Sequence, residues 1–173
     1  HPQVAFTLYK NDKEIYRLPK SKLSQRIVHL FGKSYEKQLI PCTEKTETAA
    51  IHGYIGTPQK AKRRGAKQSF FVNGRYVKSG YLHHAIKKAF VQLIQPETHP
   101  FYVLFIEVDP AQLDVNIHPS KTEVQFENEG YLYALLSSAI KKSLALAQVT
   151  PALDFTQDPT TLLPAEGTRE YAP

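Results

Sequence analysis

The stretch of this sequence best equipped for chemistry is a polar loop over residues 114–124, which reads Asp-Val-Asn-Ile-His-Pro-Ser-Lys-Thr-Glu-Val. Its lysine, Lys121, suits a terminal phosphate, because a compact ammonium on a flexible stem acts as a point charge without the fork geometry of arginine. Residue chemistry alone leaves open whether this lysine serves a phosphate or is one solvated base among 22. Neighbouring residues could support the loop by hydrogen bonding or by stiffening its backbone, namely Asn116, His118, Pro119 and Ser120.

Two stiff elements must hold this loop in place. Residues 101–108 before it are apolar on both alternating faces until Glu107, a pattern typical of a central strand. Beyond the loop, apolar residues recur at helical spacing from Leu132 to Ala147 and predict an amphipathic helix. Lys121 would therefore project from a supported position.

Turn residues and hydrophobic periodicity define the remaining elements. Asn73-Gly74 between short β-forming runs is a strong hairpin signal, because both turn residues need positive φ. Ser79 can cap the helix that follows, and its apolar stripe continues to Ile94 before Pro96 ends it. Nearer the N-terminus, a hairpin, a helix and a second hairpin are predicted over residues 4–18, 23–31 and 38–56.

The order of these elements predicts an α+β fold. We expect a two-layer sandwich, in which about three helices cover a mixed, mostly antiparallel sheet. Residues 1–148 would form this one domain, since a chain of 173 residues leaves little room for two cores. Residues 149–173 hold four prolines among small and acidic residues, and so we interpret them as a linker or tail.

The predicted domain is basic. Residues 150–173 hold one base and four acids, so the preceding 149 residues hold 21 of the 22 bases and 12 of the 16 acids. Such an excess can attract a polyanion, although it also fits an ordinary solvated surface. The candidates for contacts with DNA phosphates lie in and after an exposed, irregular loop at residues 57–67, and are Arg63, Arg64, Arg75, Lys78, Lys87 and Lys88.

Several classes of protein are disfavoured. The single cysteine, Cys42, can form no internal disulfide and is expected to be a small core residue. The histidines lack the spacing of a zinc site, so no metal is expected, and no phosphate-loop or dinucleotide-binding motif occurs. No apolar run could span a membrane, and no secretory signal opens the chain. The absence of any methionine favours an excerpt from a longer protein.

Two stretches together carry a family resemblance. The first is Phe-Phe-Val-Asn-Gly-Arg-Tyr-Val at residues 70–77, followed by a helix with His84-Ala85-Ile86. The second is the loop run Asn-Ile-His-Pro-Ser-Lys-Thr-Glu-Val. Over about residues 1–148 the chain resembles the second domain in the ATPase region of MutL-type DNA mismatch repair proteins.

The resemblance implies a fold and a role. The fold would be that of the second domain of a small-subunit ribosomal protein, with an unusual left-handed βαβ crossover shared among the GHKL ATPases. An upstream domain would bind ATP and Mg²⁺, and Lys121 would reach across to the γ-phosphate as the catalytic residue. This chain alone is not expected to hydrolyse ATP or to hold a cofactor, whereas the parent protein is expected to be an ATPase.

The resemblance also implies partners. These are the phosphate backbone of DNA, the upstream ATPase domain of the same chain, other mismatch repair proteins and, in a dimeric parent, a second subunit, with no membrane. The compartment would be the cytoplasm, near the nucleoid, in a bacterium and the nucleus in a eukaryote. Two alternatives stay open, a stand-alone nucleic-acid-binding module and a partner-docking domain without a nucleotide role.

Overall fold

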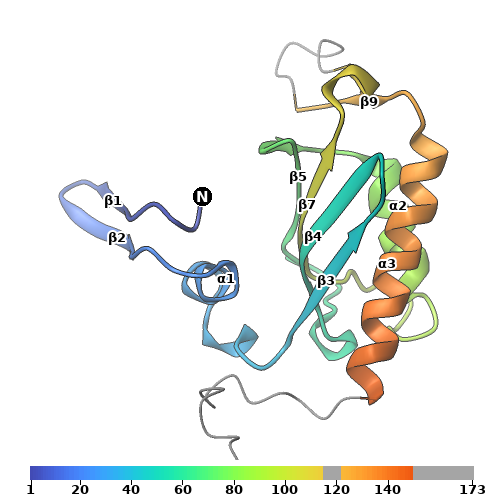
Figure 1. Cartoon of the computed structure of the whole chain (residues 1–173). Coiled ribbons are helices and arrows are strands. Elements are labelled where there is room, and N and C mark those ends of the chain that lie inside the picture. Colours follow the sequence, from blue (N-terminus) through green and yellow to red (C-terminus); the bar gives the residue numbers. More distant parts are fainter. Residues whose placement is uncertain (115–121, 150–173) are drawn as a thin grey trace, which may run out of the picture.

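A five-stranded sheet forms the centre of the computed structural model, which describes residues 1–114 and 122–149 (Figure 1). Its strands lie in the order β3-β4-β7-β5-β6. Neighbouring strands are antiparallel except for β5 and β7, which are parallel, so the predicted mixed, mostly antiparallel sheet is confirmed. The strand bounds are β3 (Leu39–Lys45), β4 (Ala49–Gly56), β5 (Gln68–Val72), β6 (Arg75–Val77) and β7 (Tyr102–Val108).

Helices cover both faces of this sheet. Helices α2 (Gly80–Phe90) and α3 (Glu129–Val149) lie side by side on one face, over the main hydrophobic core (Figure 1). Helix α1 (Leu23–Phe31) lies on the other face, over a smaller core that includes Phe101 and Val103. The two cores take alternate residues of β7, because successive side chains of a strand point to opposite faces. The predicted α+β fold with three helices is thereby confirmed, and α1 on the second face of the sheet adds a layer to the two that were expected.

The crossover from β5 to β7 is left-handed, which is the rare hand for such a connection. The chain leaves β5, forms β6 and α2, and returns as β7 beside β5. In Figure 1 both strands run upward, β5 lies behind β7 and α2 lies to the right of the sheet. Seen from the helix side, the step from β5 to β7 therefore goes to the left. The great majority of such connections are right-handed.

Local sequence signals explain several element ends. Asn73 and Gly74 have φ values of 46° and 79°, as the tight turn between β5 and β6 requires. The Ser79 hydroxyl accepts a hydrogen bond from the Leu82 amide at 3.2 Å and caps α2. The predicted core role of Cys42 is confirmed, since its side chain is fully buried and burial raises the pKa of its thiol.

Two segments differ from the sequence-based expectation. Helix α2 ends at Phe90, although the apolar stripe continues, and Leu93 is 39% exposed. The loop at residues 57–67 holds one turn of 3-10 helix, η2 (Pro58–Lys60), and Lys62 pairs with His99 as an isolated bridge. The Lys60 ammonium lies 5.2 Å from the centre of the Tyr35 ring, so part of this loop is fixed by packing against the domain.

The N-terminal hairpin stands apart from the sheet (Figure 1). It consists of β1 (Phe6–Lys10) and β2 (Lys13–Leu18). The Arg26 guanidinium on α1 donates to three backbone carbonyls around the hairpin, those of Pro2, Val4 and Pro19 at 3.1, 2.7 and 3.0 Å. The division at residue 148 stays a prediction, because residues 150–173 lie outside the described part of the chain.

Candidate functional site

The loop with the candidate catalytic lysine is described only at its two stems. Lys121, together with Asn116, His118, Pro119 and Ser120, lies outside the described residues. After β7 the chain forms a 3-10 turn, η3 (Pro110–Gln112), and the short strand β8 (Leu113–Asp114). On the other side of the loop, β9 (Gln125–Phe126) pairs with β8 in antiparallel register.

These stems are joined to each other and to the β5–β6 hairpin. The Glu127 amide donates to the Gln112 carbonyl at 2.9 Å and extends the pairing of β8 with β9. Val124 and Phe126 are buried in the main core. The Lys78 amide, just after β6, donates to the Thr122 carbonyl at 2.7 Å. The two stretches that carry the family resemblance, far apart in sequence, therefore meet at the root of the loop.

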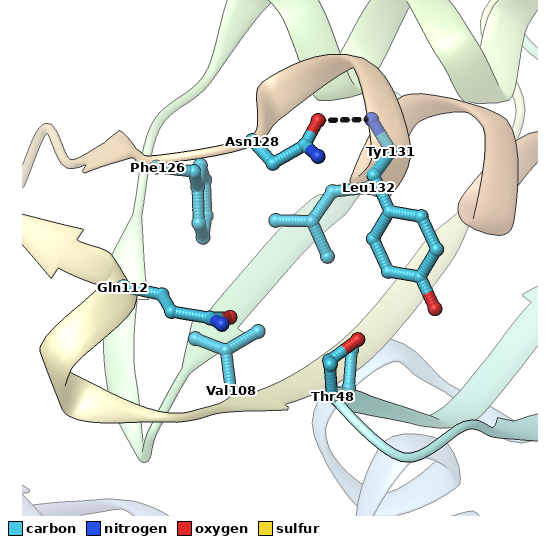
Figure 2. A pocket seen from close by; sticks show the side chains of 8 residues that line it. Thr48, Val108, Gln112, Phe126, Asn128, Tyr131 and Leu132 are labelled. Atoms are coloured by element: carbon cyan, nitrogen blue, oxygen red, sulfur yellow. Dashed lines mark hydrogen bonds between the residues drawn. The ribbon is translucent and has the colours of Figure 1, made fainter.

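A small cavity lies beside the stems, between β7, the β8–β9 pair and the start of α3 (Figure 2). Within it, the Asn128 side-chain oxygen accepts a hydrogen bond from the Tyr131 amide at 3.0 Å. Its volume of about 20 Å³ is enough for a single water molecule and far too small for a nucleotide. The lining residues are Thr48, Ala49, Val108, Gln112, Phe126, Asn128, Tyr131 and Leu132. A bound nucleotide would have to be held elsewhere.

The structure does not gather the six candidate DNA-contacting cations into one patch. Arg63 and Arg64 are exposed in the loop that leads into the start of β5. Arg75 is exposed opposite Val72, at the other end of β5. Because a strand rises about 3.3 Å per residue, β5 itself spans about 13 Å between its two ends. The remaining three are in or just before α2, where Lys78 and Lys88 are exposed and Lys87 is half-buried.

A polar cluster lies beneath α2. The His83 Nδ1 atom is 3.1 Å from the Tyr102 hydroxyl, and the centres of the His83 and His99 rings are 6.0 Å apart. Burial lowers the pKa of His83 below its ordinary value, and the charges of His99 and Lys87 lower it further. These effects favour the neutral form of the His83 imidazole, which lies against the Tyr102 hydroxyl.

Neither a metal centre nor a membrane span was found in the part of the chain that the structure describes. Over residues 1–114 and 122–149, no three side chains of the His, Cys, Asp or Glu type converge as ligands. Within the same ranges, no helix is long and apolar enough to cross a bilayer.

Asn73 was expected only as a turn residue, but its side chain also contacts the end of β7. The carboxamide forms two hydrogen bonds with the backbone of Val108, directly before η3 and the loop. A side-chain contact between residues 35 positions apart leaves no periodic signal in a sequence. The only available signal was the position of Asn73 inside the Phe-Val-Asn-Gly-Arg run.

Solved structures with a similar fold come from DNA repair proteins. The crystal structure of the N-terminal domain of a DNA repair protein superposes with a TM-score of 0.67 at 17% identity, covering 80% of this chain and 45% of that one. The ATPase domain of the mismatch repair endonuclease MutL from Aquifex aeolicus gives a TM-score of 0.52 at 19% identity, with the same coverage. At these identities the comparison defines a class by fold, that of a domain found in the ATPase region of such proteins.

The sequence comparisons then define the family. Residues 27–145 match the family model described as DNA mismatch repair protein, C-terminal domain. The chain is 44% identical over 165 residues to MutL of Bacteroides fragilis, and 46% identical over 158 residues to MutL of Flavobacterium psychrophilum. These matches cover 95% and 91% of the chain but 26% of each relative, so the chain spans about a quarter of their length. The chain belongs to the MutL family of DNA mismatch repair proteins.

Proposed function

We propose that this domain is the transducer of a DNA mismatch repair ATPase, and that Lys121 contacts the γ-phosphate of ATP bound by an upstream GHKL domain. The observation that carries the proposal is that the family match over residues 27–145 runs through the loop. The described stems agree with it, since β8 and β9, which flank the loop in sequence, pair with each other. A cation at that position would stabilise charge on the transferred phosphoryl group.

ATP and Mg²⁺ would be held mainly by the upstream domain. The small cavity beside the stems has room for one water molecule, and the described residues offer no set of metal ligands. When bound, ATP supplies the phosphoryl group that is transferred to water. This chain would contribute the position of one ammonium group and would not hydrolyse ATP by itself.

The N-terminal hairpin supports a contact with the upstream domain. On its apolar face, Phe6, Leu8 and Tyr16 are 51%, 41% and 40% exposed. These three side chains share one face, because Leu8 pairs with Tyr16 and Phe6 lies two residues before Leu8. An isolated two-stranded hairpin is at best marginally stable in water. We therefore assign this face to the contact with the upstream domain.

Replacing Lys121 by alanine in the full-length protein tests the nucleotide role. We expect kcat for ATP hydrolysis to fall about a hundredfold, because one preorganised contact to developing charge is lost. Steady-state ATPase kinetics measure the change. The matched control is Lys141→Ala, which removes an exposed lysine of α3 and should leave turnover unchanged. Equal turnover of the Lys121→Ala variant and the unaltered protein would refute the role.

The basic surface supports a second role, contact with the DNA backbone. Arg75 and Lys78 are exposed, and the Lys78 amide donates to Thr122 in the second stem. The first 149 residues carry nine more bases than acids, 21 against 12. We propose that these cations contact phosphates without reading sequence.

Other mismatch repair proteins and a second subunit would assemble on the parent protein, which would act in the cytoplasm of a bacterium or the nucleus of a eukaryote.

Salt-dependent affinity for duplex DNA tests this second role. A plot of log affinity against log salt concentration should have a negative slope for the unaltered chain, because bound phosphates release counterions. The double change Arg75→Gln, Lys78→Gln should reduce that slope by about two, one for each lost contact. The double change Arg63→Gln, Arg64→Gln removes equal charge at the other end of β5 and shows which end touches DNA. No measurable affinity at low salt would favour the partner-docking alternative.

A further inference from the structure

The side-chain carboxamide of Asn73 forms the two hydrogen bonds that a backbone peptide group of a neighbouring strand would form. Its Nδ2 atom donates to the Val108 carbonyl at 3.0 Å, and its Oδ1 atom accepts from the Val108 amide at 3.0 Å. Its own amide donates to the Ile106 carbonyl at 2.9 Å. One residue of the β5–β6 turn thus forms three hydrogen bonds with two residues at the end of β7, Ile106 and Val108.

The topology of the sheet explains why a side chain is needed there. The parallel pairing of β5 with β7 ends where Val72 lies opposite Ile106, because the chain then turns into β6. Val108 still pairs with Ala49 of β4 on its other side. Without Asn73, the amide and carbonyl of Val108 that face β5 would lose their protein partners. The carboxamide extends the ladder to the point where the chain leaves the sheet toward η3.

The same hairpin also holds the second stem. The Lys78 amide donates to the Thr122 carbonyl at 2.7 Å, and Thr122 directly follows the segment that contains Lys121. Val77, the last residue of β6, is buried in the main core, so this attachment point is itself fixed. The β5–β6 hairpin therefore contacts the chain both before and after the loop.

We propose that Asn73 is a positioning residue for the loop, which fixes the place and direction in which the chain enters it. This inference rests on the proposed role of Lys121. Asn73 would act through Val108, with which its side chain forms both of its hydrogen bonds. A contact to a transferred phosphoryl group depends on placement, and a shift of about 1 Å at the reacting centre can cost about a hundredfold in rate.

A turn requirement alone does not account for Asn73. Its φ of 46° favours asparagine or glycine over other residues, and glycine reaches this region at no steric cost. Asn11, in the turn between β1 and β2, has a φ of 50°, yet no hydrogen bond of its carboxamide occurs among the described residues. The two positions share a conformation, but only Asn73 forms this pair of side-chain hydrogen bonds with Val108, which we call the Asn73 clamp. Asn11→Gly is therefore a matched control for Asn73→Gly.

The first experiment tests the clamp in this chain and needs no nucleotide. Hydrogen exchange of the Val108 amide should accelerate about threefold to tenfold in Asn73→Gly, equivalent to the net loss of one hydrogen bond. Asn11→Gly should leave that amide unchanged. Asn73→Asp keeps the acceptor for the Val108 amide, folds with the same positive φ, and should keep most of the protection. Equal protection of Val108 in Asn73→Gly and Asn11→Gly would overturn the clamp.

The second experiment tests positioning in the full-length protein by a double-mutant cycle with Lys121→Ala. Asn73→Gly should lower kcat for ATP about tenfold or more while KM for ATP changes little. In the Lys121→Ala background the same change should have almost no further effect, because the group it positions is already absent. Asn73→Asp replaces the donor to the Val108 carbonyl by an oxygen, and should lower kcat in the same background-dependent way if Asn73→Gly does not fold.

The outcomes separate the two proposals. If Lys121→Ala leaves turnover unchanged, the proposed function fails, whatever Asn73 does. If Lys121→Ala lowers turnover and the Asn73 variants do not, the proposed function stands and the positioning inference is wrong. An equal loss of kcat from Asn73→Gly in both backgrounds would mark a general structural effect and would also overturn the inference. If kcat of the Asn73→Asp variant equals that of the unaltered protein, the hydrogen bond from Asn73 Nδ2 to the Val108 carbonyl is not needed for positioning.

Discussion

Replacing Gly53 by alanine is expected to lower the free energy of unfolding by about 3 kcal/mol or more, the sum of backbone strain and steric overlap. Gly53 lies in the middle of β4, between Cys42 of β3 and Leu104 of β7, with a φ of 143°. A Cβ atom there would overlap the carbonyl oxygen of Val103 and lie 3.0 Å from the Cα atom of Leu104. Both are backbone atoms of a central strand, so neither can move without disturbing the ladder.

A second glycine separates the two causes of this loss. Gly65 has a φ of 70°, but among the described residues no heavy atom outside its chain neighbours lies within 4 Å of the place where its Cβ would be. Gly65→Ala should therefore cost only about 1 kcal/mol, the strain of a left-handed alanine. Urea unfolding followed by far-ultraviolet circular dichroism measures both variants. A loss in Gly53→Ala no larger than that in Gly65→Ala would show that the sheet opens to accept a methyl group at this point.

Elements with local signals were predictable from sequence. The Asn73-Gly74 turn, the Ser79 cap and the strand of residues 101–108 each depend on neighbours only a few positions away. The end of α2 was not predictable, since the stripe through Leu93 and Ile94 continues the helical spacing. The structure uses Ile94 as a partly buried residue against the main core after the helix has ended at Phe90. Periodicity reports which residues face the core, and not whether the backbone stays helical.

Pairings between distant segments could not be predicted from the pattern. No local sequence signal indicates that β7 lies between β4 and β5, or that α1 covers the opposite face of the sheet from α2 and α3. The left-handed crossover contradicts the general rule for such connections, and only the family resemblance indicated it. The same holds for the Asn73 clamp, in which a turn residue supplies a bond that the strand order leaves missing.

The candidate site was predictable in part, for a chemical reason. An ammonium group suits a phosphate at any of the lysines, so residue chemistry cannot choose Lys121 among 22 bases. The motif around the lysine made that choice, which stays a prediction because Lys121 lies outside the described residues. The six candidate DNA contacts were chosen by charge and by their placement in the chain, and the fold distributes them over both ends of β5 and along α2. A sequence shows which residues are charged, but the part of the surface on which they lie depends on the strand order.

Replacing Phe101 by alanine is expected to have the other large effect, a loss of about 3–5 kcal/mol in the free energy of unfolding, as for other buried aromatic residues. Phe101 is 1% exposed and lies at the centre of the smaller core. Its ring centre is 4.5 Å from that of Tyr35 and 5.7 Å from that of Phe31. Truncation would remove an aromatic contact that α1 and the 3-10 turn η1 (Lys33–Tyr35) both make beside β7.

The location of the damage distinguishes this prediction from a general loss of stability. Hydrogen exchange in residues 23–35 should accelerate more than exchange in α2 and α3, which pack on the opposite face. Leu30→Ala is the control, because Leu30 lies in α1 but is 37% exposed, and it should cost less than about 1 kcal/mol. Uniform acceleration over all three helices in Phe101→Ala would mean that the two cores unfold as one unit.

This second core also bears on the proposed function. Arg26 of α1 binds the three carbonyls around the N-terminal hairpin, and the smaller core binds α1 to β7. If the hairpin contacts the upstream domain as proposed, this chain of contacts connects that domain to the strand that ends at Val108. Phe101→Ala should then lower kcat for ATP in the full-length protein, even though Phe101 is distant in sequence from Lys121. Unchanged turnover, in a variant whose α1 amides exchange faster, would show that the upstream domain is positioned without α1.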